Sequence, residues 1–432
     1  MGSCKAAKCA RVLLSSILCL IFFSALGRAD VLTLEEAVRV ALANNRQILI
    51  AKEKIEEARH RIEEAKAGYL PTINLSGTYT RLSEAPSMSV PGYGSIEMGK
   101  ADNYLSRVSF TQMLYSSGIL KYGNQGASLY YQKSEEDLKN AQNSITYQVK
   151  KAFYAVLLAE RNLEVTEAAL DQSERHLAVV EGLFEAGVVS KFDLLRTRVQ
   201  VANLKPDLIQ ARNNLHLSLE SLANLLSLPS TSLKLEGGLS FGPLKVTLEE
   251  ALDRALEERS DLKSVQLQKE ISEVVLKLAE VQNKPNLALV GNYQYQNPSG
   301  GEDEWGGEWN LNLVLSVPLF DGWANRARVA QRRSQVRQIE LSLQGLEDGI
   351  DLEVKKAFWD VEASEERIHA QEKNIEQAEE ALSIAEVRYK SGAITNLEVL
   401  DAQLTVTRAR LGYLKALYDH NVAMAELERA TK

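Results

Sequence analysis

The side chains that most often perform chemistry in proteins are few in this 432-residue chain, and they stand apart from one another. Its three cysteines all lie within the first 29 residues, and neither a GxSxG motif nor a phosphate-binding P-loop is present. The five histidines occur singly, without HExxH or another paired ligand spacing, so surface or packing roles are expected for them. The sequence therefore gives no support for an enzyme and predicts no cofactor or metal. These histidines are His60, His176, His216, His369 and His420.

Acidic residues follow two glycines that are suited to end a helix, Gly187 and Gly392. The spacings Ser190-x-x-Asp193 and Thr395-x-x-Glu398 are those of capping boxes, in which the carboxylate stabilises the start of the next helix. Asp401 has no capping role at its position. Carboxylates that cluster favour cations and raise one another's pKa, so these three residues are candidates for a cation-selective filter or gate.

The helices that carry these turns belong to a duplicated unit. TLEEA at 33–37 recurs 214 residues later at 247–251, and VKKAF at 149–153 recurs 205 residues later at 354–358. We therefore expect a first repeat over 30–246 and a second over 247–432. Each repeat opens with a capping box that predicts a helix, over 33–70 and over 247–284. Each helix is followed by a proline, Pro71 or Pro285, which cannot continue it.

Alternating segments follow both prolines. Apolar and polar residues alternate over 72–82 and 103–113 in the first repeat, and over 286–296 and 307–317 in the second. These patterns predict four strands, each with one apolar and one polar face. The links between partner strands are rich in Gly, Pro and charged residues and are expected to be exposed loops. Trp305 and Trp309, beside the second of these links, are candidates for an aromatic belt at a membrane interface.

Very long helical patterns come next, over 118–186 and 323–391, and neither contains a proline. Apolar residues recur at strict sevens in both, which predicts coiled-coil packing. Shorter helices over 190–227 and 395–430 return after Gly187 and Gly392, so each repeat ends in a coiled-coil hairpin. A linker rich in Gly and Pro over 228–246 joins the two repeats.

The start of the chain has the layout of a cleavable secretory signal over residues 1–29, with cleavage near Asp30 or Val31. Cys19 raises a lipoprotein alternative, although Leu18 stands where a small residue is preferred. Removing this segment leaves 46 basic and 58 acidic residues and a formal charge of −12, which argues against a nucleic-acid partner. After Asp30 no apolar run approaches the ~20 residues of a transmembrane helix, so membrane insertion would have to use the strands.

The four strands have the length of ~9–11 residues that crosses a bilayer at a tilt, but four strands cannot close into a barrel. Because unpaired edges are not tolerated in lipid, several chains must pool their strands; two chains would give a small filled barrel, and three would give twelve strands with room for a channel. The alternative is a structural coiled-coil envelope spacer without a pore.

Two segments carry a family likeness. RYKSGAITNLEVLDAQ at 388–403 and GVVSKFDLL at 187–195 resemble the second and first hairpin turns of the TolC-like outer-membrane efflux family, and the helix-proline-strand units at Pro71 and Pro285 fit the same family. The resemblance covers the chain after the signal. It implies a mainly α fold with a membrane β-barrel: a homotrimer whose strands complete a twelve-stranded barrel in outer-membrane lipid, with a long antiparallel coiled-coil α-barrel in the periplasm.

The function that this resemblance implies is a passive duct of a tripartite efflux or type I secretion system. The partners would be a periplasmic adaptor and an inner-membrane RND or ABC pump, and the closed tip would open when they dock. The resemblance places aperture acids at Asp193, Glu398 and Asp401 and the tip tyrosine at Tyr389, which the heptad pattern alternatively assigns to packing. Ile394 replaces the family's tip arginine. The sequence does not identify the cargo, the pump or the adaptor.

Overall fold

A computed structural model describes residues 31–432 except 93, 98, 230–232 and 301. The predicted signal segment over 1–29, its cysteines and the cleavage site lie outside the described residues. The described part forms two compact units, one built from residues 31–50, 138–259 and 348–432, and the other from 51–137 and 260–347. Each sequence repeat contributes to both units, so the units do not coincide with the repeats.

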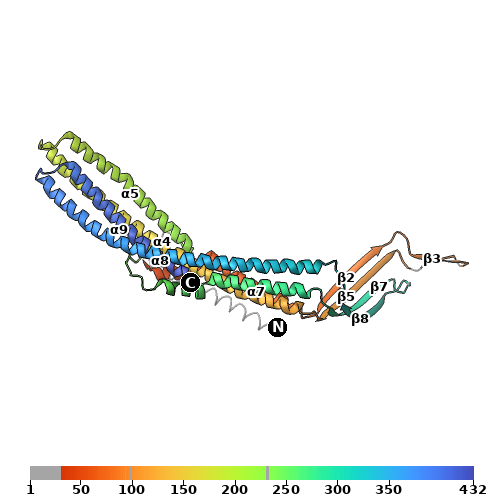
Figure 1. The fold of residues 1–432 in the computed structure, drawn as a ribbon. Helices are drawn as coiled ribbons and strands as arrows, with labels where there is room; N and C mark the ends of the chain where they lie inside the picture. The colour runs from red at the N-terminus through yellow and green to blue at the C-terminus, as the bar shows by residue number, and fades with distance from the viewer. Residues whose placement is uncertain (1–30, 93, 98, 230–232, 301) are drawn as a thin grey trace, which may run out of the picture. The chain divides into compact units, whose positions relative to one another are not determined.

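The long helices and their hairpins dominate the first unit. Helices α4 (Ile119–Glu185) and α8 (Ala324–Lys390) contribute their later parts to this unit, and α5 (Lys191–Leu226) and α9 (Asn396–Ala430) return beside them (Figure 1). Cross-helix ion pairs join the arms of each hairpin, Arg198 to Glu181 at 2.9 Å and Arg410 to Glu379 at 2.6 Å. We call α4 with α5 the first hairpin and α8 with α9 the second hairpin.

Burial follows the predicted heptad seams. Val149 and Val156 in α4, and Val354, Val361 and Ile368 in α8, are all fully buried. In the first repeat the opening helical segment packs against the same seam. Its residues Ala37, Ala41 and Ile48 form one buried cluster with Phe153, Leu222 and Leu226. The seam opens near its end, where Phe184 is 38% exposed.

The structure corrects the prediction of one continuous helix at the start of each repeat. Residues 33–70 form α2 (Leu34–Asn44) and α3 (Arg46–Ala67), and residues 247–284 form α6 (Leu248–Glu258) and α7 (Ser260–Val281). The breaks fall at Asn45 and Arg259, which are equivalent positions in the two repeats and have non-helical ψ angles of 130° and 122°.

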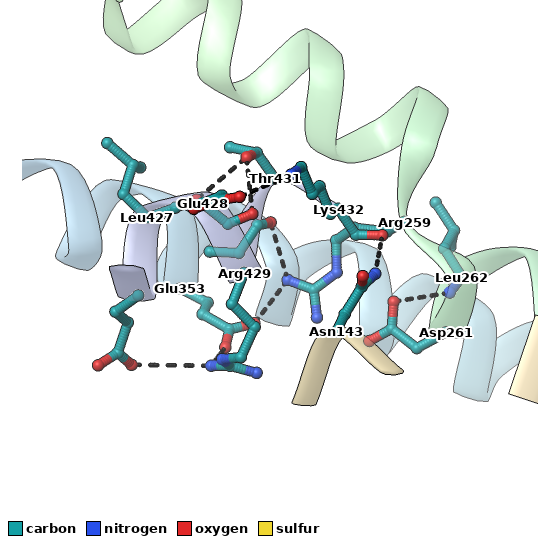
Figure 2. Close-up of polar contacts among 12 residues, drawn as sticks. Asn143, Arg259, Asp261, Leu262, Glu353, Leu427, Glu428, Arg429, Thr431 and Lys432 are labelled. Atoms are coloured by element: carbon teal, nitrogen blue, oxygen red, sulfur yellow. Dashed lines mark hydrogen bonds and ion pairs between the residues drawn. The ribbon is translucent and has the colours of Figure 1, made fainter. Parts of the chain in front are cut away.

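Long-range hydrogen bonds explain both breaks. The buried Asn45 amide donates to the Leu225 carbonyl at 2.9 Å, near the end of α5. The buried Arg259 guanidinium donates to the Ala430 carbonyl at 3.2 Å, at the end of α9, and to Glu353 at 2.6 Å (Figure 2). Leu225 and Ala430 are themselves equivalent at the 205-residue offset, so each break ties the opening helices of its repeat to the end of the closing helix.

The second unit contains the predicted sheet. Its strands are β2 (Thr72–Arg81), β5 (Asp102–Tyr115), β7 (Asn286–Asn297) and β8 (Gly306–Ser316), hydrogen-bonded in that order and antiparallel throughout. Pairing of β5 with β7 joins the repeats into one sheet and leaves β2 and β8 as its edges. The prediction of a mainly helical chain with four long strands is confirmed.

Two pairs of short strands occur in addition to the four predicted strands. The first link contains a hairpin of β3 (Ser87–Val90) and β4 (Gly94–Glu97). In the first unit, β1 (Val31–Leu32) pairs in parallel with β6 (Lys234–Leu235) of the linker. Among the described residues, no helix has the length and apolar character that crossing a membrane requires.

Candidate functional site at the hairpin tips

Both hairpins turn through the same backbone motif. Gly187 and Gly392 adopt left-handed φ angles of 75° and 73°. Each glycine donates its N–H to the carbonyl three residues earlier at 2.9 Å, and the following residue, Val188 or Ala393, donates to the carbonyl five residues earlier at 2.9 Å. This is the Schellman ending, which satisfies the last carbonyls of α4 and α8. Both turns lie at the same end of the first unit (Figure 1).

The acid of the first turn is held by its cap. The Asp193 carboxylate accepts the Ser190 hydroxyl at 2.6 Å and the Ser190 backbone N–H at 3.3 Å. The Ser190 hydroxyl oxygen in turn accepts the Asp193 N–H at 3.1 Å. These bonds form the reciprocal capping box that the sequence predicts, and they orient the Asp193 carboxylate over the start of α5.

The second turn is built in a similar way. The Glu398 carboxylate accepts the Thr395 backbone N–H at 3.3 Å and the Thr395 hydroxyl at 3.0 Å. Asp401 lies almost one helical turn further along α9, with an exposed side chain. The backbone carbonyl of Asp401 accepts the Thr405 hydroxyl at 2.8 Å, and the Asp401 carboxylate takes part in no helix cap among the described residues.

Tyr389 lies in the apolar core between the two hairpins. It clusters with Val180 of α4, Leu194 of α5 and Val399 of α9 and is 8% exposed. Its hydroxyl has no hydrogen-bond partner among the described residues. Burial, and then the charge of Asp193, raise the pKa of the Tyr389 phenol above its usual range. This environment matches the packing role that the heptad pattern predicts.

Ile394 packs partly buried against the same cluster, at the position where the resemblance would place an arginine. An apolar side chain there adds contact area to the junction of the hairpins. It cannot contribute an ion pair, so any polar link between the hairpins at this level must come from other residues.

A buried polar network forms such a link. His176 of α4 contacts Asn396 of α9, with Nε2 2.7 Å from Oδ1. The Asn396 amide nitrogen donates to the Thr197 hydroxyl oxygen of α5 at 2.9 Å and to the Asp193 carbonyl at 3.3 Å. Asn396 is 3% exposed and Thr197 is fully buried. The imidazole also packs on the Tyr389 ring, with 5.3 Å between the ring centroids.

Beside this network lies a cavity of about 410 Å³ between α4, α8 and α9. Gln172, His176, Glu386, Tyr389 and Gln403 are among the residues that line it. The Gln172 amide donates to the Glu386 carboxylate at 3.1 Å, which is a further hydrogen bond between the hairpins. Tyr389 Oη and Gln403 Oε1 are buried without a partner among the described residues, and such atoms are usually satisfied by ordered water. No cluster of three or more His, Cys, Asp or Glu side chains in the described ranges could hold a metal.

The structure therefore gathers both turns, the capping acids and Tyr389 at one end of the first unit. Sequence reasoning missed His176, Asn396 and Thr197. His176 was expected to be a surface or packing residue, and its polar partners lie 220 residues away in Asn396 and beyond. Nothing in the local sequence marks that contact.

Comparisons with known proteins agree with this architecture. Residues 37–227 and 251–431 match the family model for outer membrane efflux proteins. The outer membrane protein TolC of Vibrio cholerae is 24% identical over 408 residues, covering 92% of this chain and 90% of that protein. The alkaline protease secretion protein AprF of Pseudomonas aeruginosa is 23% identical, covering 92% and 84%.

Among solved structures, the open state of the MtrE outer membrane channel of Neisseria gonorrhoeae aligns with a TM-score of 0.76 at 20% identity. The alignment covers 92% of this chain and 88% of MtrE. This match shows that the helical hairpins and the sheet have a similar fold in the two proteins. With the family model matching both repeats almost completely, the chain belongs to the outer membrane efflux protein family and is a TolC-type protein of the outer membrane.

Proposed function

We propose that three copies of this chain pool their strands into a twelve-stranded barrel and form a passive export duct. The periplasmic hairpins would continue the barrel and receive substrate from an inner-membrane pump through a periplasmic adaptor. The observation that carries the proposal is the four-stranded sheet with two open edges. A sheet of four strands cannot enclose a pore, and its edges must be paired before it can reside in lipid.

The edges of the sheet have the character that such pairing requires. Every residue of β2 is exposed in the single chain, and β8 is exposed along almost its whole length. On β8, Trp309, Leu311, Leu313 and Leu315 form a continuous apolar face, while Asn310 and Asn312 lie on the other face. An apolar outer face and a polar inner face are the pattern of a membrane barrel around an aqueous channel.

Internal symmetry predicts the register between chains. Strand β5 corresponds to β8 at the 205-residue offset, and β2 corresponds to β7 at the 214-residue offset. Within the chain, Arg107 of β5 pairs with Gln294 of β7. The equivalent pair is Asn312 of β8 with Thr80 of β2 in a neighbouring chain. In this register Asn312 lies opposite Thr80 and Leu313 lies opposite Tyr79, whereas a one-residue slip would place Asn312 opposite Tyr79.

Cysteine cross-linking tests both the assembly and the register. All cysteines of the chain lie in the first 29 residues, so engineered cysteines have no competitor in the described part. The pair Asn312→Cys with Thr80→Cys should give covalent trimers under oxidising conditions. The control pair Asn312→Cys with Tyr79→Cys places the thiols on opposite faces and should not cross-link. Monomers only from the first pair, or equal linking of both, would contradict the proposal.

Aromatic rings near one end of the sheet support a membrane boundary there. Tyr79 and Tyr104 lie 5.1 Å apart between ring centroids, Tyr104 lies 6.0 Å from Trp305, and Trp305 stacks on Tyr295 at 5.1 Å. Tyrosine and tryptophan concentrate where a barrel leaves the lipid. Trp305 therefore fits the aromatic belt predicted from the sequence.

The hairpin tips would form the periplasmic entrance. We propose that Glu398, Asp401 and Asp193 from three chains surround this entrance and favour cations there. We propose no specific cargo or pump, only that the duct serves an efflux or type I secretion system. The related AprF is named for the secretion of a protease. Another relative, TtgC of Pseudomonas putida, is named as the outer membrane protein of a toluene efflux pump.

A further inference from the structure

We infer that His176, Asn396 and Thr197 form a clasp that holds the two hairpins of one chain together and thereby positions the tip carboxylates. We call these three residues the hairpin clasp. The inference rests on the proposed function, because it concerns how the entrance of the duct is held at rest. The clasp lies in the first unit and joins three helices, α4, α5 and α9.

The direction of every hydrogen bond in the clasp can be assigned. Thr197 donates its hydroxyl to the Asp193 carbonyl at 2.9 Å, so its oxygen is left to accept from Asn396. The Asn396 nitrogen also faces the Asp193 carbonyl, which can only accept. The Asn396 oxygen must therefore face His176 and accept from Nε2–H. A flipped Asn396 amide would place oxygen against oxygen, so the chain of donors has a single arrangement.

Burial gives the clasp its strength. All three side chains are at least nine-tenths buried, and the His176 ring and both ends of the Asn396 amide would lose their partners if the hairpins separated in place. A buried donor or acceptor without a partner costs the full desolvation penalty of that group. The clasp therefore opposes movement of the second hairpin relative to the first until water can enter between them.

The location of the clasp connects it to the tip acids. Asn396 is the first residue of α9, directly after Thr395, whose backbone N–H binds the Glu398 carboxylate. At its other end the clasp binds the backbone of Asp193 itself. The two helix starts that carry the tip carboxylates are thus joined to each other through Asn396, which fixes their spacing.

The clasp is not a requirement of the repeated fold. At the equivalent positions of the other repeat, 205 residues away, stand Ala381 for His176, Lys191 for Asn396 and Ala402 for Thr197. Both hairpins nevertheless form the same Schellman turn, and an ion pair joins the two arms of each. A trimer would therefore contain one clasp per chain, between that chain's own hairpins, and no equivalent bond at the remaining junctions.

Single-channel recording on full-length protein in planar bilayers tests the inference. His176→Leu removes the donor to Asn396, whereas His176→Gln keeps an N–H donor in a neutral side chain. We expect a several-fold rise in conductance and weaker block by La³⁺ for His176→Leu, and values near wild type for His176→Gln. Thr197→Val preserves the side-chain shape and removes the hydroxyl that accepts from Asn396, so we expect the same changes as for His176→Leu. If His176→Leu does not assemble, Thr197→Val tests the inference in its place.

A second buried histidine provides the matched control. His420 is 1% exposed and contacts the Ser364 hydroxyl and the Gly242 carbonyl, both at 2.9 Å, far along α9 from the tip. His420→Leu should lower the unfolding temperature and leave conductance and block unchanged. If both clasp variants lose thermal stability as His420→Leu does, with wild-type conductance and block, the clasp is merely structural and the inference is wrong. Absence of conductance from the wild-type trimer would instead contradict the proposed duct.

Discussion

Two acidic residues at the tips have a local structural role and, in the proposed trimer, would also line the entrance of the duct. The carboxylates of Asp193 and Glu398 are oriented by hydrogen bonds from Ser190 and Thr395. The Asp401 carboxylate is exposed and is not positioned to cap the helix. The caps fix where the first two charges stand. In a trimer these positions would meet around one axis, and mutual repulsion would make the charges sensitive to bound cations.

Neutralising the tip charges should change conduction without unfolding the tip. Glu398→Gln combined with Asp401→Asn removes two charges per chain and keeps an oxygen able to cap α9. We expect higher single-channel conductance and weaker block by multivalent cations, measured in planar bilayers. Glu53→Gln with Glu64→Gln, two exposed residues of α3, removes the same charge elsewhere and serves as control. Equal behaviour of the two double variants would remove these acids from the entrance.

The sequence predicted those residues whose partners are close along the chain. Ser190, Asp193 and Gly187 could be assigned because a helix cap and a helix ending are recognisable from residues only three or four positions apart. His176 could not, since its partner Asn396 is 220 residues away and neither residue belongs to a recognisable motif. Its buried environment arises only when two hairpins pack together.

At the scale of elements, the broken opening helices distinguish the repeats chemically. Asn45 closes its break with a neutral amide, whereas Arg259 does so within an ionic cluster that includes Glu353 and Arg429 (Figure 2). The helical pattern predicted continuous helices because neither residue type interrupts a helix by itself. The carbonyls that capture their side chains lie 180 and 171 residues away, beyond any local signal.

The ionic break should make the second repeat sensitive to acid. Burial raises the pKa of Glu353, but hydrogen bonds and charge from Arg259, and then from Arg429, outweigh burial and hold this pKa below its ordinary 4.5. A folded pKa below the unfolded one gives stability that is present above about pH 4.5 and is lost as the pH falls through the folded value. Because the Glu353 side chain is 29% exposed, Glu353→Gln should lower the free energy of unfolding at pH 7 by about 1–2 kcal/mol, less than the loss of a fully buried pair.

Thermal unfolding followed by circular dichroism between pH 3 and 7 measures this effect. The difference between wild type and Glu353→Gln should shrink as the pH falls. Asn45→Ala, which removes the equivalent neutral bond, should cost about 1 kcal/mol at every pH in this range. A Glu353→Gln deficit that stays constant with pH would show that the ion pairs contribute no titrating stability.

The hairpin turns depend on glycine because of backbone angle alone. No atom lies within 4 Å of a methyl group added at Gly187 or Gly392, but both residues have positive φ. Gly187→Ala or Gly392→Ala should each cost about 1–2 kcal/mol in thermal unfolding. Gly182→Ala, in the regular part of α4 with equal space, should instead stabilise by about 0.5–1 kcal/mol. Loss of stability in all three variants would point to packing rather than φ.

At the scale of the whole molecule, the proposed function makes the single chain an incomplete membrane protein, because its four-stranded sheet has two unpaired edges. Each repeat contributes two strands, and the pairing of β5 with β7 joins these two pairs of strands into one sheet. The strand pattern, the long helices and the duplication were all readable from the sequence because alternation and heptads are local. The pairing of β5 with β7 was not, since it joins segments that no short loop connects.

Planar-bilayer conductance of the detergent-purified mature protein, with oligomeric mass taken on the same sample, tests the central claim most directly. We expect a trimer that gives small, cation-preferring conductance steps, because three acidic tips would narrow the entrance of a continuous pore. A monomer without conductance would contradict the account and would favour a coiled-coil spacer of the cell envelope.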